Sequence, residues 1–164
     1  MNNFISIKNI SKSFSNNKKV TVLKKINYSF AKGKIYSLMG PSGSGKSTLL
    51  NILSMIDKPT TGSLLIGNDT IDFNDNTDND RIRSKKIGII YQQNNLLPDF
   101  TALENVYLAG LASSNDKKNS IEKAKKIIKK MSLSSRQYHY PSELSGGEMQ
   151  RIAIARALIN EPEI

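Results

Sequence analysis

The alternation of apolar and polar positions predicts β-strands in the first part of the chain. Residues 4–8 and 22–30 alternate between apolar and polar side chains, which is typical of strands with one covered face. Residues 34–39 and 87–91 are short, mostly apolar runs, and such runs favour parallel strands buried on both faces. A further strand is predicted at Ser63–Ile66, where the chain resumes after a turn.

Apolar positions three or four residues apart predict helices between these strands and after them. One helix covers Lys46–Met55, another starts near Thr101, and the last begins at Ser145 or Gly146. Residues 163–164 then resemble the start of another strand. A further helix is predicted from the apolar stripe formed by Ile121, Ala124, Ile127, Ile128 and Met131. Strands and helices in alternation imply an α/β fold, with a sheet between helices.

Composition places the chain among ordinary globular domains. Hydrophobic residues make up 38% of its 164 positions, a length at which one domain with a substantial core is expected. No run approaches the roughly 18 to 20 apolar residues of a membrane span, and the alternating N-terminal residues do not form the apolar core of a signal peptide. We therefore expect a cytosolic chain. The absence of cysteine excludes disulfides and thiolate metal sites, and one histidine disfavours a histidine zinc site.

The formal net charge of +10 could serve nucleic acid, an anionic membrane face or a polyphosphate ligand. Most lysines are scattered along the chain, which argues against a dedicated nucleic-acid groove. The densest cluster surrounds a predicted helix that has its own apolar stripe, so it is read as a solvated face or as a contact for acidic lipid head groups or a partner. This cluster consists of Lys117, Lys118, Lys123, Lys125, Lys126, Lys129 and Lys130.

Residues 68–80 form a polar segment in which acidic and amide side chains alternate from Asp72 to Asn76. The alternation faintly resembles a calcium-binding loop. However, Thr77 occupies the position where such a loop needs glycine, and Arg83 occupies that of the bidentate glutamate. We therefore interpret the segment as solvated surface and not as a calcium site.

A phosphate-binding loop is predicted where the apolar run 34–39 ends and a helix begins. The sequence from Gly40 to Ser47 fits G-x-x-x-x-G-K-[ST], with a strand before it and a helix after it. Glycines let successive backbone N–H groups point at phosphate oxygens, and the helix adds its positive dipole end. Lys46 is expected on the β- and γ-phosphates of ATP, and Ser47 on Mg²⁺. The predicted ATP site comprises Gly40, Pro41, Ser42, Gly43, Ser44, Gly45, Lys46, Ser47 and Thr48.

A second glycine-containing turn leads into the last predicted helix about a hundred residues later. Taken alone, Ser145 could be an ordinary helix N-cap, or the turn could bind an anion through its N–H groups. Together with the phosphate loop, it resembles the pair formed by the Walker A loop and the LSGGQ signature of ABC transporter ATPases. The signature residues are Leu144, Ser145, Gly146, Gly147 and Glu148. Glu148 replaces the family's usual glutamine, a common variant that leaves the Ser-Gly-Gly contact unchanged.

The resemblance extends over essentially the whole chain and implies its architecture. It implies a P-loop NTPase core with an antiparallel β subdomain and a helical subdomain. Residues 1–92 would form the ATP-binding core and β subdomain, 93–145 the Q-loop connector and helical subdomain, and 146–164 the signature helix. In this family two ATPase domains meet head to tail, and the signature of one caps ATP held by the other.

Further site residues are implied by the same resemblance. Gln92 looks like the Q-loop glutamine that touches Mg²⁺ and the attacking water, with adjacent Gln93 as a competing candidate. Phe14 lies where the family places an aromatic that stacks on adenine, although it could also be a core residue after an edge strand. His139 precedes the signature, so it cannot be the family's switch histidine and is read as a surface residue.

Two stretches, residues 91–106 and 141–148, are similar to the lipoprotein-releasing (LolD-type) ATPases of this family. Macrolide-exporter and cell-division ATPases have overlapping motifs and stay as alternatives. The resemblance implies an energy-coupling subunit that drives lipoprotein release from the inner membrane. It would work as a homodimer together with transmembrane permease subunits, and it would lie peripherally at the cytoplasmic face of the membrane. Its ligands would be ATP and Mg²⁺, and it would not bind nucleic acid.

The family's catalytic Walker B strand would follow Ile164, and we expect the C-terminal strands to be missing with it. Hydrolysis by residues 1–164 alone is therefore doubtful, because no general base would orient the water. The sequence leaves open a fragment, a decayed gene product and a non-catalytic nucleotide-binding remnant. A DNA-associated ATPase with the same two loops is disfavoured, because no long heptad run or cysteine-based insertion separates them.

Overall fold

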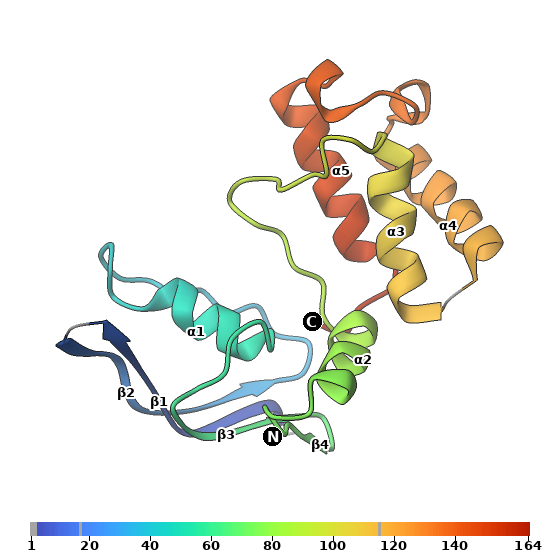
Figure 1. The fold of residues 1–164 in the computed structure, drawn as a ribbon. Coiled ribbons are helices and arrows are strands. Elements are labelled where there is room, and N and C mark those ends of the chain that lie inside the picture. Colours follow the sequence, from blue (N-terminus) through green and yellow to red (C-terminus); the bar gives the residue numbers. More distant parts are fainter. Residues whose placement is uncertain (1–2, 17, 115) are drawn as a thin grey trace. The chain divides into compact units, whose positions relative to one another are not determined.

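The computed structural model describes residues 3–16, 18–114 and 116–164 (Figure 1). The chain divides into two compact units, Met1–Asn79 and Asp80–Ile164. The first unit is built on an antiparallel sheet and one helix, and the second on a bundle of three helices. None of the helices among these residues is long and apolar enough to cross a bilayer.

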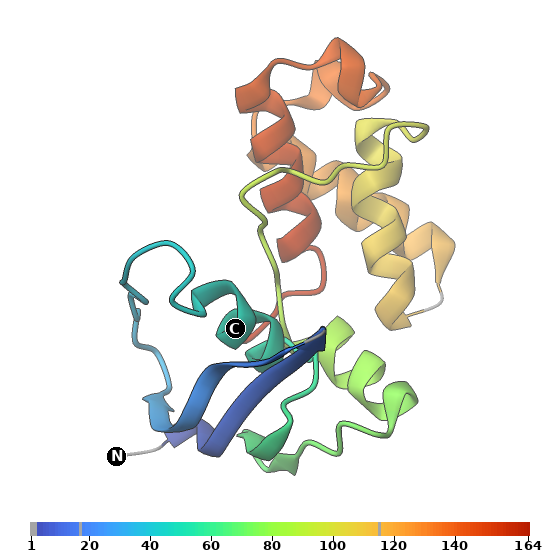
Figure 2. The same ribbon diagram turned by 60° about the vertical axis from the view of Figure 1, so that its left-hand side comes forward.

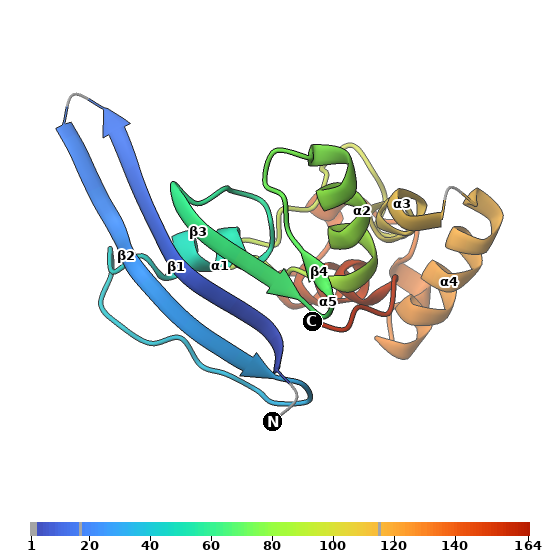
Figure 3. The ribbon, with the colours of Figure 1, turned by 90° about the horizontal axis from the view of Figure 1, so that it is seen from below.

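The sheet of the first unit has four strands in the order β2-β1-β3-β4. They are β1 (Asn3–Asn16), β2 (Lys18–Ala31), β3 (Thr61–Ile66) and β4 (Asp69–Thr70). All neighbouring strands are antiparallel, and β1 and β2 form a long hairpin with β3 on the other side of β1 (Figure 3). The two alternating strands and the strand predicted at Ser63–Ile66 are thereby confirmed, and the two alternating strands are much longer than their patterns indicated.

Ile5 and Ile7 of β1 point to one side of the sheet and are covered there. Ile5 pairs with Ile66 and Ile7 with Leu64 across β1 and β3, and all four side chains are buried. Because side chains alternate across a strand, these residues share one face. Burying such a side chain contributes about 1.5–3 kcal/mol, so this apolar layer is the main stabilising feature of the sheet.

Helix α1 (Lys46–Leu53) is the helix of the first unit (Figure 1), and one of its faces is buried. Leu49 and Ile52 are its buried residues, three positions apart and therefore on one face. The predicted helix over 46–55 is confirmed but ends earlier. The Ser54 hydroxyl donates to the Leu50 carbonyl at 2.8 Å, and Met55 adopts a left-handed backbone (φ 57°) that a helix cannot continue.

The predicted strand at residues 34–39 is wrong for this structure. The segment is extended but pairs with no strand among the described residues, and its apolar side chains are exposed, with Ile35 at 101%. A parallel strand requires a neighbouring strand for its backbone groups and its side chains. Tyr36 ties the segment to β2: its hydroxyl accepts a hydrogen bond from the Ala31 N–H at 2.7 Å, and its ring packs edge-on against Phe30.

Helix α2 (Asn76–Lys86) was not predicted, since the sequence shows only a polar surface segment there. The Asp75 carboxylate accepts from the Asp78 N–H at 3.0 Å, and the Asp72 carboxylate closes a turn by accepting from the Asn74 N–H at 2.9 Å. The acidic residues therefore form a turn and a helix start. Ile82 is the one apolar residue of this helix that is buried, too weak a signal for a periodicity argument.

The second unit is a bundle of three helices, coloured yellow to red in Figure 2. They are α3 (Ala102–Ser114), α4 (Lys117–Lys130) and α5 (Gly146–Leu158), with short 3₁₀ turns at Ser134–Arg136 and Pro141–Glu143. The helices predicted near Thr101, around the stripe at 121–131 and from Gly146 are confirmed. Their shared core consists of Ala102, Leu103, Val106, Ala124, Ile128, Leu133, Leu144, Ile152, Ala155 and Ile159.

Residues 87–91 also lack the buried parallel strand that their pattern predicts. Ile90 and Tyr91 are 50% and 40% exposed. Nevertheless, the first residues of this run bond to the last residues of the chain: the Gly88 N–H donates to the Ile164 carbonyl at 2.9 Å, and the Ile164 N–H donates to the Lys86 carbonyl at 3.0 Å. This alternation is the hydrogen-bond pattern of a parallel pair, so Ile164 lies beside the run in parallel orientation.

Candidate functional site

The loop from Gly40 to Gly45 has a backbone shape that only glycine adopts without strain. Gly43 and Gly45 have φ angles of 77° and 90°, and Gly40 has 152°. A Cβ atom at Gly45 would lie 2.9 Å from a methyl carbon of Leu23, and one at Gly40 would lie 2.9 Å from the Ser44 hydroxyl. Space and dihedral angle therefore both require glycine, and the loop curls so that its N–H groups can converge on an anion.

The Lys46 ammonium is folded back over this loop. Its Nζ donates to the Gly40 carbonyl at 2.8 Å and to the Pro41 carbonyl at 2.7 Å. The positive charge is thus held at the mouth of the loop, at the start of α1. An ammonium has three donors, so contacts to two carbonyls leave capacity for a further acceptor such as a phosphate oxygen.

The N-terminus of α1 has no side-chain cap. Its N-cap is Gly45, which offers no side-chain acceptor to the first-turn N–H groups, and the first turn holds no acidic residue. Uncapped N–H groups and the helix dipole together favour a bound anion. Ser47 is exposed in the same turn, so its hydroxyl is accessible, and Thr48 is half-buried beside it. The geometry of the loop thus fits a bound polyphosphate, and the Ser47 hydroxyl is available to a cation beside it.

Phe14 lies near the far end of β1, where it pairs with Val20 of β2. Its side chain is 45% exposed, so the alternative of a core residue is wrong. The Lys12 ammonium lies over its ring at 5.0 Å from the centroid. The exposed aromatic remains a candidate for stacking on a base. Lys12 was not identified as a partner of this ring from the sequence, because a lysine in a strand gives no signal for such a contact.

The connector after residues 87–91 is irregular, and both candidate glutamines, Gln92 and Gln93, are exposed on it. Their side chains do not separate the two candidates. The following residues are held by α5: the Arg156 guanidinium donates to the carbonyls of Asn94 and Asn95, both at 2.7 Å. Burial lowers the pKa of Arg156, and the nearby phenol of Tyr91 acts in the opposite direction.

A second side chain holds the other half of the connector. Asn105 of α3 is 1% exposed, and its amide NH₂ donates to the carbonyls of Leu97 at 3.1 Å and Phe100 at 2.9 Å. Its amide oxygen accepts from the Leu97 N–H at 2.7 Å. Sequence reasoning missed both Arg156 and Asn105, because their partners are backbone atoms of a segment distant in sequence or irregular in shape.

The signature turn begins α5 with a closed capping box. The Ser145 hydroxyl accepts from the Glu148 N–H at 3.3 Å, and the Glu148 carboxylate accepts from the Ser145 N–H at 2.8 Å. Arg136 adds a contact from its Nε to Glu148 at 3.1 Å. Hydrogen bonds from the Ser145 N–H and hydroxyl lower the pKa of Glu148, and the charge of Arg136 adds to the effect. The N-cap interpretation of Ser145 is therefore confirmed.

The two signature glycines are open to solvent. A Cβ atom at Gly146 would meet nothing within 4 Å, and one at Gly147 would meet only the Arg151 guanidinium at 3.8 Å. Leu144, in contrast, is buried in the helical core. The turn thus presents an uncovered backbone surface at a helix N-terminus, which is suited to close approach by a ligand or another chain.

The remaining candidates lie on the surface of the second unit. His139 is half-buried, and its Nε2 lies 3.2 Å from the Arg136 guanidinium, which can only donate, so the ring nitrogen accepts. Within the described part of the chain, no group of three or more histidine or acidic residues could hold a metal ion. The clustered lysines of α4 are all exposed, on a helix whose buried residues are Ser120, Ala124 and Ile128.

The predicted residues divide between the two units. The phosphate loop, Lys46 and Phe14 lie in the first unit, and Gln92 and the signature turn lie in the second.

Comparison with known proteins agrees with this geometry. A model of the family described as ABC transporter matches residues 23–164. A lipoprotein-releasing system ATP-binding protein LolD from Rickettsia felis is 48% identical over 100% of this chain and 73% of its own length. The LolD protein of Rickettsia bellii is 44% identical over 99% of this chain and 72% of its own length.

The fold is shared with solved ATP-binding cassettes. The cassette MJ0796, in a dimeric post-hydrolysis state bound to ADP and Pi, superposes with a TM-score of 0.88 at 40% identity, covering 96% of this chain and 70% of that one. The predicted fold class, a P-loop ATPase core with an antiparallel β subdomain and a helical subdomain, is confirmed. By its sequence, its fold and its two glycine-containing loops, the chain belongs to the ABC transporter family.

Proposed function

We propose that this protein binds and hydrolyses ATP as the energy-coupling subunit of a transporter that releases lipoproteins from the inner membrane. The observation that carries the proposal is the 44–48% identity to LolD proteins over 99–100% of this chain. The glycine loop with its lysine and uncapped helix supports the nucleotide part of it.

The triphosphate would lie in the loop from Gly40 to Ser47. Backbone N–H groups of the loop and the first turn of α1 donate to the phosphate oxygens, and Lys46 places its charge on the β- and γ-phosphates. Its Nζ reaches the carbonyls of Gly40 and Pro41 at 2.8 and 2.7 Å and keeps a third donor for a phosphate oxygen. Phe14 would stack on adenine with its exposed ring.

Mg²⁺ would be held by the Ser47 hydroxyl of the phosphate loop, and the family resemblance adds the amide oxygen of Gln92. Each side chain is exposed within its own unit and carries an oxygen atom, the ligand type that Mg²⁺ prefers. When bound, the ion neutralises charge on the β- and γ-phosphates. The contribution of the protein is to hold the phosphates with the loop and to orient water near Gln92.

The signature residues act on a second copy of the chain. Ser145, Gly146 and Gly147 are exposed at the start of α5 and would approach the γ-phosphate bound to the partner copy. The uncovered backbone at these glycines supports such close contact. A homodimer with two such sites would close on ATP and reopen on hydrolysis, as the dimeric solved relatives suggest.

The connector and the helical bundle would pass this motion to permease subunits. Leu97 and Phe100 are 45% and 38% exposed on the connector, although both are apolar. Exposed apolar side chains on a held segment favour a protein contact.

The proposal includes the division of the chain into an ATP-binding core and β subdomain (1–92), a connector and helical subdomain (93–145) and a signature helix (146–164). It also includes a peripheral position of the protein at the cytoplasmic face of the inner membrane.

Two experiments test the proposal at separate levels. Titration calorimetry of the purified protein with MgATP is expected to show saturable binding, and no binding would refute the nucleotide site.

In Gram-negative cells depleted of their own lipoprotein-releasing ATPase, the gene with its neighbouring permease genes should restore outer-membrane localisation of lipoproteins. Restored macrolide export without lipoprotein release would instead assign the protein to the exporter subfamily.

A further inference from the structure

We propose that Lys12 is a positioning residue that holds the Phe14 ring at a set place relative to the phosphate loop, and thereby determines how tightly an adenine base binds. The inference rests on the proposed function, in which Phe14 stacks on adenine while the loop before α1 holds the phosphates. Every residue that carries it lies in the first unit.

The first step is the contact between the two side chains. Lys12 and Phe14 are two residues apart on β1 and therefore lie on the same face of the sheet. The Lys12 ammonium lies over the ring at 5.0 Å from its centroid, and the lysine side chain is only 11% exposed. A cation over an aromatic face is attracted by the ring quadrupole, more strongly when water is excluded. The ring is still 45% exposed, so it keeps accessible surface for a ligand.

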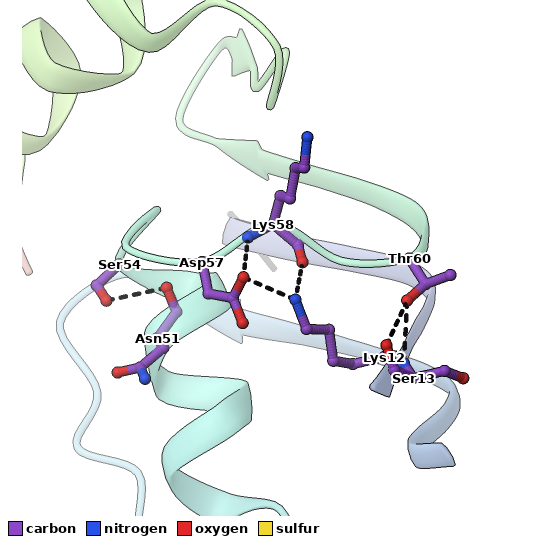
Figure 4. A network of polar contacts seen from close by, with 7 residues as sticks. All are labelled: Lys12, Ser13, Asn51, Ser54, Asp57, Lys58 and Thr60. Atoms are coloured by element: carbon purple, nitrogen blue, oxygen red, sulfur yellow. Dashed lines mark hydrogen bonds and ion pairs between the residues drawn. The ribbon is translucent and has the colours of Figure 1, made fainter. Parts of the chain in front are cut away.

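The second step is the anchoring of the ammonium. Its Nζ donates to the Asp57 carboxylate and to the Lys58 carbonyl, both at 2.7 Å (Figure 4). Beside it, the Ser13 N–H donates to the Thr60 hydroxyl at 2.9 Å, which joins the same two segments again. Charge-assisted hydrogen bonds of this length are strong and directional, so the Lys12 ammonium has a defined position over the ring.

The third step connects this anchor to the phosphate site. The Asp57 N–H donates to the carbonyl of Asn51, in the last turn of α1, at 3.1 Å. Helix α1 begins at Lys46 and spans eight residues, or about 12 Å at the helical rise per residue. A continuous path of contacts therefore runs from the Phe14 ring through Lys12 and Asp57 to the helix that carries the phosphate-binding lysine. Lys12 thus sets the spacing between the base platform and the phosphate loop.

The test compares a ligand that has the base with one that lacks it. In Lys12→Met the stem keeps its volume but the charge and its hydrogen bonds are lost. We expect the affinity for MgATP to fall about three- to tenfold, the range for a partly desolvated cation–aromatic contact. The affinity for magnesium tripolyphosphate, which lacks adenine, should be unchanged. A purely structural role of Lys12 would lower both affinities together.

Matched variants isolate the Lys12–Phe14 relationship. Lys8→Met makes the same chemical change at an exposed position of β1 and should leave both affinities unchanged. Lys12→Arg keeps a cation under the ring and should restore MgATP binding. In Phe14→Ala, the further change Lys12→Met should cost no additional affinity, because the lysine then has no ring to hold. If Lys12→Met does not fold by circular dichroism, Asp57→Asn weakens the same anchor and takes its place.

Three results would overturn the inference. They are equal losses for MgATP and tripolyphosphate in Lys12→Met, no loss for either, or fully additive losses in the double variant with Phe14→Ala. The failure of the proposed function is distinguishable, because wild-type protein would then bind neither ligand. Unchanged MgATP affinity in Phe14→Ala would remove the base platform and this inference, while tripolyphosphate binding would still support the phosphate loop.

Discussion

The guanidinium of Arg156 joins the signature helix to the connector by donating to the carbonyls of Asn94 and Asn95, each at 2.7 Å. Asn95 has a left-handed backbone (φ 47°), a conformation that asparagine tolerates better than most residues. Two donors in a fixed fork hold two consecutive peptide groups, so the residues after Gln92 move together with α5.

This clamp predicts a specific effect of Arg156→Lys. A lysine can reach one carbonyl but does not present the planar fork, so the free energy of unfolding should fall by about 1–3 kcal/mol. Hydrogen exchange should quicken at the amides of residues 94–97, measured by mass spectrometry. Arg151→Lys, on the exposed side of the same helix, should change neither quantity. Unchanged exchange in Arg156→Lys would show that the connector is held by other contacts.

Lys46→Ala tests the phosphate loop. Because charged hydrogen bonds contribute strongly to phosphate binding, the affinity for MgATP should fall at least about tenfold. Calorimetry measures the change, with Lys24→Ala as a matched loss of an exposed lysine in the same unit. The melting temperature without nucleotide controls for the internal bonds from Lys46 to Gly40 and Pro41. If Lys46→Ala binds MgATP like the wild type, Lys46 is not the phosphate ligand.

Gly147→Tyr tests the action of the signature across a dimer. A side chain at Gly147 would meet only the Arg151 guanidinium, at 3.8 Å, so the fold should be preserved. The variant should bind MgATP as a monomer but fail to form an ATP-stabilised dimer, because the side chain occupies the place where the backbone must approach phosphate. Light scattering with MgATP measures this, and Ala112→Tyr on the exposed side of α3 is the control. Normal dimerisation of Gly147→Tyr would refute the signature assignment.

The capping box predicts a pH-dependent contribution of Glu148 to stability. Its pKa is lowered, so the carboxylate is favoured in the folded protein. The stabilisation is present above the unfolded pKa of about 4.3 and is lost as the pH falls through the lower folded value. Glu148→Gln should therefore melt at a lower temperature than wild type at pH 7, and the difference should shrink below about pH 4.

Thermal unfolding followed by circular dichroism between pH 7 and pH 3 measures this difference. Glu122→Gln, at a carboxylate that is 59% exposed on α4, is the matched control and should show no such trend. If the difference in melting temperature between Glu148→Gln and wild type stays constant with pH, then packing, and not the charge of Glu148, stabilises the protein at this position.

Motifs whose chemistry is local were predictable from the sequence. The loop from Gly40 to Ser47 needs positive φ angles and close approach, which are properties of its own glycines, and the structure shows both. The capping of α5 by Ser145 likewise depends on residues three positions apart. The long hairpin of β1 and β2 was indicated by alternation, although only residues 4–8 and 22–30 carried the pattern.

The apolar runs show the limit of such local reasoning. Residues 34–39 and 87–91 have the composition of buried parallel strands, yet Ile35 and Ile90 are exposed. Whether such a run is buried depends on a neighbouring strand, which no property of the run itself specifies. Helix α2 was missed for the opposite reason, because turn hydrogen bonds and one buried isoleucine form it without a stripe.

The sequence by itself determined the family. It also predicted the local backbone of the glycine loop before α1 and the capped start of α5, because each is a short stretch whose backbone chemistry is complete within itself. Only the tertiary structure decided which distant residues support them. Lys12 meets Asp57 forty-five positions later, and Arg156 reaches Asn95 from sixty-one positions away. A lysine in a strand and an arginine on a helix look like ordinary surface residues in sequence. Their partners are set by the packing of elements, through contacts that side-chain periodicity does not encode.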